Sequence, residues 1–232
     1  KILLNKKIRL TLLIHDINSL RKKARDMNED TLLNYAQTII VHTEAMKEYL
    51  IKRGIAASKL VVLTSFDYLT EETIPQREYS HTIVFAGNLE KSGFLHKIPR
   101  NCFGVKFHCY GLHVGTLPQN LSYCGAFSPE NVTALQGSWG LVWDGDSVDT
   151  CDGVYGDYLR MNSPHKLSLY IVSGLPVIVW ADSALAGYVK EKNLGITINS
   201  MRDLNTVLNN ISNNKYKAML DAIHKEAQEL KN

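Results

Sequence analysis

The stretch SPHKLSLYIVSGLPVIVW, residues 163–180, contains the pattern that decides the fold of this chain. Its helical part covers 165–173 and ends at Gly174, a typical stop signal. Pro176 follows, and 177–180 is then the short apolar run of a buried strand. A helix, a tight turn and a buried strand in immediate succession predict an α/β protein.

The start of this helix carries an unusual set of side chains. Pro164 suits the first turn of a helix, and Asn162 or Ser163 can cap it. His165 and Lys166 then lie beside backbone N–H groups that have no intrahelical partner. A cation at the positive end of a helix dipole is electrostatically misplaced unless an anion is also bound. We therefore expect a phosphate at this helix start; the alternative is that Lys166 points into water.

The composition excludes several classes of function. Of 232 residues, 45% are hydrophobic and 21% charged, as in ordinary globular proteins. A net charge of +3 is too balanced to predict nucleic-acid binding. No apolar run approaches the ~20 residues of a membrane span, so we expect a cytoplasmic protein with at most a peripheral membrane association. Because the four cysteines form no C-x-x-C pair, we expect reduced thiols and no zinc.

Strand and helix patterns alternate in two blocks, separated by a polar linker at 67–81 that contains Pro75. This alternation predicts two doubly wound, Rossmann-like domains with parallel sheets that face a cleft. We place the amino-terminal domain at 1–75, the second domain at 76–214 and a long amphipathic helix at 215–232. Because the chain starts without Met in an apolar pattern, we expect the amino-terminal domain to be incomplete. The strand patterns lie at 8–16, 38–43, 59–66, 81–89, 105–111, 121–127, 139–145, 177–180 and 195–199.

The stretch FAGNLEKSG, residues 85–93, is a candidate phosphate-binding turn. Gly87 and Asn88 follow a strand pattern, and glycine lets a backbone approach a ligand closely. Lys91, a few residues later, could meet a phosphate. A plain turn between a strand and a helix is the alternative.

A long acidic and glycine-rich loop follows the strand pattern at 139–145. It should lie at the carboxyl end of that strand, where open α/β sheets bind ligands. Asp144 and Asp146 could form a D-x-D metal site, although a flexible solvated loop would show the same composition.

Two further features could contribute to chemistry. His15 and Asp16 follow the first strand pattern and could supply a general base, or could simply end the strand. Tyr123 could stack on a base or a sugar, or could be a core or rim residue.

Four stretches together resemble the bacterial sugar transferases of the GT-B fold. They are FAGNLEKSGFL (85–95), YCGAF (123–127), WGLVWDG (139–145) and YGDYLRMNSPHKLSLYIVSGLPVIVW (155–180). The resemblance is to a group that contains the glucosyltransferases extending N-acetylglucosamine on serine-rich-repeat adhesins and related galactofuranosyltransferases. It spans roughly residues 11–225 and is most specific at 139–180.

The resemblance implies an enzyme that moves glucose or galactofuranose from a UDP-sugar to a glycan or glycoprotein acceptor that carries N-acetylglucosamine. UDP-glucose is the expected donor. No permanently bound cofactor and no metal are expected, because a lysine and a helix start can stabilise the leaving diphosphate. We also expect a homo-oligomer, and a last helix that returns to the first domain.

The resemblance also assigns residues. Gly87 and Asn88 match the first glycine turn of the nucleotide domain, and Lys91 lies where a basic residue reaches the diphosphate. Tyr123 lies near the expected uracil. The phosphate-facing helix start comprises Asn162, Pro164, His165 and Lys166. Many GT-B enzymes hold the ribose with a glutamate where this chain has Leu169, so we expect ribose contacts from 144–158, including Asp144.

The sequence leaves the reaction course and two other functions open. An inverting enzyme needs a general base, for which His15 and Asp16 are the candidates, whereas a retaining enzyme needs none. The absence of glutamate at Leu169 also fits a non-catalytic partner or scaffold of a glycosylation complex. A metal-dependent transferase that uses Asp144 and Asp146 is the third alternative.

Overall fold

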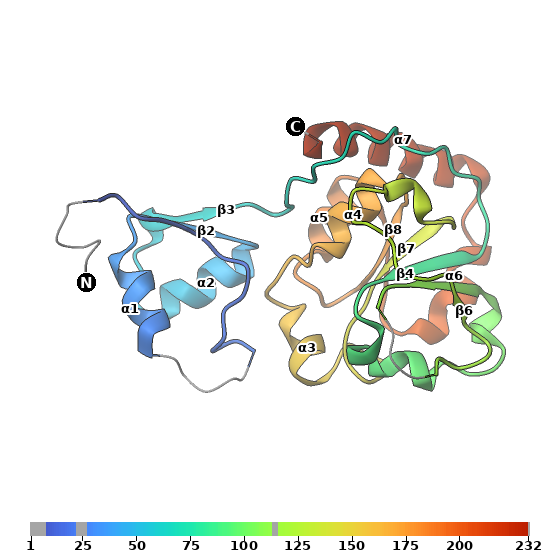
Figure 1. The fold of residues 1–232 in the computed structure, drawn as a ribbon, viewed down its shortest axis with the longest axis horizontal. Coiled ribbons are helices and arrows are strands. Elements are labelled where there is room, and N and C mark those ends of the chain that lie inside the picture. Colours follow the sequence, from blue (N-terminus) through green and yellow to red (C-terminus); the bar gives the residue numbers. More distant parts are fainter. Residues whose placement is uncertain (1–7, 22–26, 113–115, 232) are drawn as a thin grey trace.

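The computed structural model of the chain describes residues 8–21, 27–112 and 116–231. It has two parallel sheets with separate hydrophobic cores, joined by an extended segment that follows β3 (Figure 1). Each of the nine strand patterns expected from the sequence contains one of the strands in these ranges. The α/β prediction is therefore confirmed.

The first sheet has three strands in the order β1-β2-β3. Two helices connect these strands and lie on the same side of the sheet in Figure 1. Their apolar side chains, including Leu33 and Met46, pack on Ile39 of the central strand. The elements are β1 (Thr11–Leu13), α1 (Met27–Tyr35), β2 (Thr38–Val41), α2 (Glu44–Lys52) and β3 (Leu60–Val62).

The second sheet has six parallel strands in the order β6-β5-β4-β7-β8-β9, which is the strand order of a Rossmann sheet. The chain moves outward from β4 in one direction and then from β7 in the other. Such an order leaves a crevice at the carboxyl ends of β4 and β7, where the connections diverge. The strands are β4 (Thr82–Ala86), β5 (Lys106–Tyr110), β6 (Ser122–Tyr123), β7 (Trp139–Val142), β8 (Val177–Trp180) and β9 (Gly195–Ile198).

Five α-helices of the described residues accompany the second sheet: α3 (Gly153–Tyr158), α4 (Lys166–Val172), α5 (Ala186–Glu191), α6 (Leu204–Asn209) and α7 (Asn213–Leu230). In Figure 1, α4, α5 and α7 lie on one side of the sheet and α6 on the other. Helix α7 packs along α4. Its end reaches the connecting segment, where Tyr68 N–H donates to the carbonyl of Leu230 at 2.8 Å. None of the helices in the described ranges is both long and apolar enough to span a membrane.

Helix α4 is fixed across β4 and β7 by Tyr170. This side chain is fully buried, and its hydroxyl accepts a hydrogen bond from the N–H of Ala86 at 2.8 Å. Its ring occupies the space beside Gly140 of β7, where a Cβ atom would lie 2.3 Å from Cγ of Tyr170. The helix therefore begins beside the crevice.

Two local features differ from what their sequence predicts. Ser128, Pro129 and Glu130 have the pattern of a helix start, but the stretch 128–138 contains only a 3-10 turn at Val132–Ala134 and no α-helix. Part of the reason is that Tyr68 and Thr70 donate side-chain hydrogen bonds to the carbonyls of Pro129 and Glu130. Neither Asn162 nor Ser163 caps α4, since no side chain caps this helix.

Candidate functional site

A cavity of about 820 Å³ opens at the carboxyl end of the second sheet. Its wall combines Ala86 and Gly87 after β4, segments 111–112 and 126–130 after β5 and β6, and residues 67–69 of the connecting segment. His165, Lys166 and Leu169 of the α4 region complete it. A larger cavity of about 980 Å³ lies beside it, against the end of α7 and away from the strand ends. The smaller cavity is the candidate site because it lies where Rossmann sheets bind ligands.

Lys166 is the cation of this cavity. Its Nζ lies 3.1 Å from Oδ2 of Asp144 and 3.4 Å from the carbonyl oxygen of Trp143, both just after β7. The same ammonium group lies 4.7 Å from the ring centroid of Phe85 in β4. Only 16% of the lysine side chain is exposed, so the charge is held at the crevice instead of in bulk water. An ammonium group at this place can donate a charge-assisted hydrogen bond to a phosphate oxygen.

The turn after β4 lies directly against this lysine. A Cβ atom at Gly87 would lie 3.0 Å from Cε of Lys166. The next loop also requires glycine, since Gly111 has φ +141° and a Cβ there would lie 1.9 Å from the carbonyl oxygen of Gly87. These close approaches make room for a ligand beside the backbone.

The segment before α4 has buried polar atoms without partners. Oδ1 of Asn162 and Oγ of Ser163 are both inaccessible to solvent and accept or donate no hydrogen bond within the described residues. Such groups require an explanation in a folded protein. Both residues directly precede Pro164 and His165, but neither is among the residues of the cavity wall.

His15, which follows β1, contacts His165 of the cavity wall but is not itself one of the wall residues. Its ring lies 5.7 Å from that of His165 and 5.7 Å from that of Phe66, stacked on both. Burial lowers the pKa of His165 and the neighbouring His15 lowers it further, against an opposite effect of Asp16. Asp16 instead forms an ion pair with Arg21 at 2.6 Å. Of the two candidate bases, His15 is therefore the one whose side chain contacts a residue of the cavity wall, His165.

Three other candidates lie outside the cavity wall. Asn88 accepts a hydrogen bond from the N–H of Lys91 at 3.1 Å and caps a 3-10 turn at Leu89–Lys91. Lys91 is exposed on that turn. Tyr123 is half exposed, and its hydroxyl donates to the carbonyl of Gly111, so it supports a residue that does line the cavity. Nucleotide contacts from these three side chains stay predictions.

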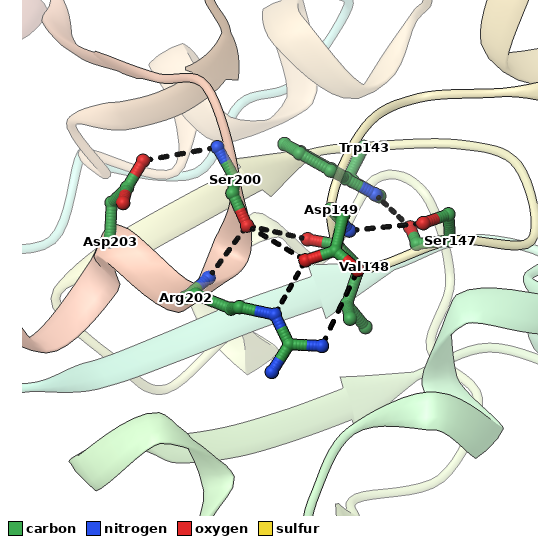
Figure 2. Close-up of polar contacts among 7 residues, drawn as sticks. All are labelled: Trp143, Ser147, Val148, Asp149, Ser200, Arg202 and Asp203. Atoms are coloured by element: carbon green, nitrogen blue, oxygen red, sulfur yellow. Dashed lines mark hydrogen bonds and ion pairs between the residues drawn. The ribbon is translucent and has the colours of Figure 1, made fainter.

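The acidic loop is fastened to the protein at several points (Figure 2). Asp149 accepts hydrogen bonds from Nε and Nη2 of Arg202, and this hydrogen bonding lowers the pKa of Asp149. The hydroxyl of Ser200 donates to the carbonyl of Val148, and Trp143 Nε1 donates to that of Ser147. Residues 144–158, expected to contact ribose, are absent from the cavity wall as far as the structure describes it.

The two aspartates of the D-x-D pattern have different surroundings. Asp144 pairs with Lys166, whereas Oδ1 of Asp146 faces Gly93, where a Cβ would lie 2.1 Å from it. In the described ranges, no three or more histidine, cysteine or acidic side chains are grouped so that they could hold a metal ion.

Sequence reasoning missed the wall formed by Tyr68, Leu112, Phe127 and Glu130. Tyr68 and Glu130 are brought together through the hydrogen bonds that join 67–72 to 128–131. Gly111, at the end of the strand pattern 105–111, was the one sequence feature that could have indicated that the loop with Leu112 lines a ligand site.

Comparison with known proteins agrees with this arrangement. The sequence pattern of the family described as "Glucosyltransferase 3-like, C-terminal domain" matches residues 83–232, and that of the corresponding N-terminal domain matches residues 1–65. The chain is 32% identical over 219 residues to the beta-1,6-galactofuranosyltransferase WbbI of Escherichia coli K12, covering 91% of this chain and 64% of that protein. It is 27% identical over 197 residues to Glucosyltransferase 3 of Streptococcus gordonii, covering 84% and 57%. The chain thus spans less than two thirds of the length of these relatives.

Solved structures share the fold at low sequence identity. The Anabaena protein Alr3699/HepE, solved in complex with UDP-glucose, has a TM-score of 0.67 at 14% identity, over 99% of this chain and 70% of that one. WaaG, a glycosyltransferase involved in lipopolysaccharide biosynthesis, has a TM-score of 0.58 at 14% identity, over 94% and 70%. The chain belongs to the glucosyltransferase 3-like family and has the GT-B fold expected from its sequence.

Proposed function

We propose that this protein is a UDP-sugar-dependent hexosyltransferase whose cavity binds the nucleotide. The observation that carries the proposal is Lys166, held over Gly87 at the carboxyl end of β4. Relatives named as a glucosyltransferase and a galactofuranosyltransferase support the reaction class, and make glucose or galactofuranose the proposed hexose.

Lys166 stabilises the leaving diphosphate in this proposal. Negative charge grows on the phosphate oxygens as the bond to the anomeric carbon breaks, and a fixed ammonium group lowers the energy of that transition state. An ammonium group has three N–H donors. Asp144 and the carbonyl of Trp143 take two of them, which leaves one for a phosphate oxygen. No metal is required for this step.

The nucleoside lies along the apolar part of the wall. Leu112, Phe127 and Leu169 offer apolar surface to a uracil ring. The carboxylates among the described wall residues are those of Asp67 and Glu130, and a carboxylate can accept hydrogen bonds from both hydroxyls of a ribose. We assign the ribose to Glu130, because hydrogen bonds from Tyr68 and Thr70 fix the backbone at 129–130.

His15 acts as the general base in an inverting reaction. It takes the proton from the acceptor hydroxyl while that oxygen attacks the anomeric carbon and the diphosphate leaves. The exposed ring of His15 stacks on His165 of the cavity wall, which supports an approach of the acceptor from this side. A product whose anomeric configuration is that of the donor, determined by NMR, would remove this role.

The test uses the full-length protein with UDP-glucose or UDP-galactofuranose and an N-acetylglucosamine-bearing acceptor. We expect turnover with one of the donors, and a UDP affinity that falls roughly tenfold in Lys166→Ala. The matched control is Lys190→Ala, which removes an exposed lysine of α5 and should leave UDP affinity unchanged. Unaltered UDP binding in Lys166→Ala, measured by calorimetry, would refute the phosphate role.

A non-catalytic partner of a glycosylation complex is the second candidate. It is favoured by Leu169, which places an aliphatic side chain in the cavity wall where many GT-B enzymes hold ribose with glutamate. Binding to another transferase without turnover of any UDP-sugar would support this alternative over the first.

A further inference from the structure

A buried imidazole connects the two sheets. His42 directly follows β2 and is 2% exposed. Its Nε2 lies 2.8 Å from the carbonyl oxygen of Ile14, and its Nδ1 lies 3.2 Å from the backbone nitrogen of Ser163. A carbonyl only accepts and a backbone N–H only donates, so the ring must be neutral, with its proton on Nε2.

The two hydrogen-bond partners of this ring lie next to two residues with different roles in the proposed reaction, the general base and the diphosphate ligand. Ile14 directly precedes His15, the proposed base, and Ser163 lies three residues before Lys166, the proposed diphosphate ligand. The ring of Phe66, whose centroid is 5.0 Å from that of His42, stacks on His15 and makes a tilted contact with His165 at 4.2 Å. One imidazole thus joins both loops through direct hydrogen bonds.

We propose that His42 is a positioning residue that sets the place of His15 relative to Lys166. The inference rests on the proposed function, and it adds a residue that touches neither the nucleotide nor the acceptor. Catalysis by oriented groups is sensitive to displacement, and a shift of about 1 Å can cost ~100-fold in rate.

Other contacts hold the sheets together without His42. Thr43 donates a hydrogen bond to the carbonyl of Met161 at 2.6 Å, and the N–H of Ile17 donates to the hydroxyl of Tyr158 at 3.2 Å. Tyr158 is also buried within the core of the first sheet. Loss of the imidazole should therefore change the alignment of the two loops more than the association of the sheets.

UDP binding and turnover should respond differently. Lys166 keeps Asp144 and the carbonyl of Trp143 when His42 is changed, so its contact with the diphosphate persists. The alignment of the base depends on the bond to Ile14. We expect kcat to fall in His42→Phe by roughly tenfold or more, with UDP affinity within about threefold of the wild type.

The test compares variants of the full-length protein. Phenylalanine keeps the ring and removes both hydrogen bonds, whereas glutamine offers one acceptor and one donor and should restore kcat. His108→Gln is the matched control, because His108 is a half-buried histidine of β5 whose ring, within the described residues, bonds the carbonyl of Gln136 and lies away from both loops. Hydrogen–deuterium exchange at Ser163 should accelerate in His42→Phe and return toward the wild-type rate in His42→Gln.

The results separate this inference from the proposed function. A folded His42→Phe variant with unchanged kcat, or with unchanged exchange at Ser163, overturns the positioning role. If the phenylalanine variant does not fold, His42→Asn replaces it, since its shorter amide can serve Ser163 but not Ile14; unchanged kcat there overturns the role equally. A wild-type protein without turnover refutes the proposed function, and the exchange comparison still decides whether His42 holds Ser163.

Discussion

Gly87 and Lys166 lie so close that a single methyl group at position 87 would meet the lysine side chain, with Cβ 3.0 Å from Cε. The two residues are 79 positions apart in sequence, one after β4 and the other at the start of α4. Tyr170 brings these elements together, because its hydroxyl binds the N–H of Ala86. The glycine turn and the cation therefore form one unit of the cavity wall.

We expect Gly87→Ala to weaken UDP binding by roughly three- to tenfold, with less than about 1 kcal/mol change in the free energy of unfolding. The new methyl group displaces the end of the flexible Lys166 side chain. This displacement changes the stability of the fold little, but it moves the ammonium group. Calorimetric titration with UDP and urea unfolding measure the two quantities. Gly187→Ala in α5 is the control, because nothing lies within 4 Å of a Cβ there. A Gly87→Ala protein that binds UDP as the wild type does would contradict this account of the wall.

We expect chelation by EDTA to leave the initial rate of sugar transfer within about twofold of its value in added Mg²⁺. The reason is that Lys166 provides the charge that a cation would otherwise supply, and its ion pair occupies one oxygen of Asp144. The measurement is the initial rate in EDTA and in Mg²⁺ or Mn²⁺. A rate lost in EDTA and restored by Mn²⁺ would instead favour the metal-dependent alternative.

The strands, and the place of the α4 start in the cavity wall, could be predicted because they depend on local pattern. Residues 163–180 contain their own stop signal and turn, and Val177–Trp180 is buried throughout, as a continuous apolar run predicts. Lys166 was predicted as the cation from its misplacement at a helix start, and the structure places it in the cavity wall.

The parts that could not be predicted depend on contacts between distant segments. Nothing near Glu130 in sequence shows that Tyr68 and Thr70 hold its segment against the cavity. The acidic loop has the composition of a solvated lid, yet Arg202, 53 positions after Asp149, fastens it to the protein. No sequence pattern around His42 indicates its role, because its two hydrogen-bond partners lie 28 and 121 positions away.

We expect Tyr170→Phe to lower the free energy of unfolding by about 1–3 kcal/mol. Removing the hydroxyl leaves the N–H of Ala86 buried without its partner, while the ring still fills the space beside Gly140. Urea unfolding measures the effect, and Tyr35→Phe on the exposed side of α1 is the control. Equal stability of the two variants would show that the hydroxyl does not fix α4 to β4.

The last prediction concerns pH and follows from the neutral state of His42. Burial lowers the pKa of His42 from its ordinary 6.5; the ionisable groups that act on it are His165 and His15, which lower it, and Asp16, which raises it. Since the folded protein releases this proton more readily than the unfolded chain, the associated stability is complete above about pH 6.5 and is lost as the pH falls through the folded-state pKa.

We therefore expect the free energy of unfolding to fall between about pH 7.5 and pH 5.5 by more in the wild type than in His42→Gln, which cannot titrate. Urea unfolding at a series of pH values measures both curves, with His108→Gln following the wild type. Parallel curves for the wild type and His42→Gln would mean that the imidazole is not held in its neutral form, and the bond that it accepts from Ser163 would then need another explanation.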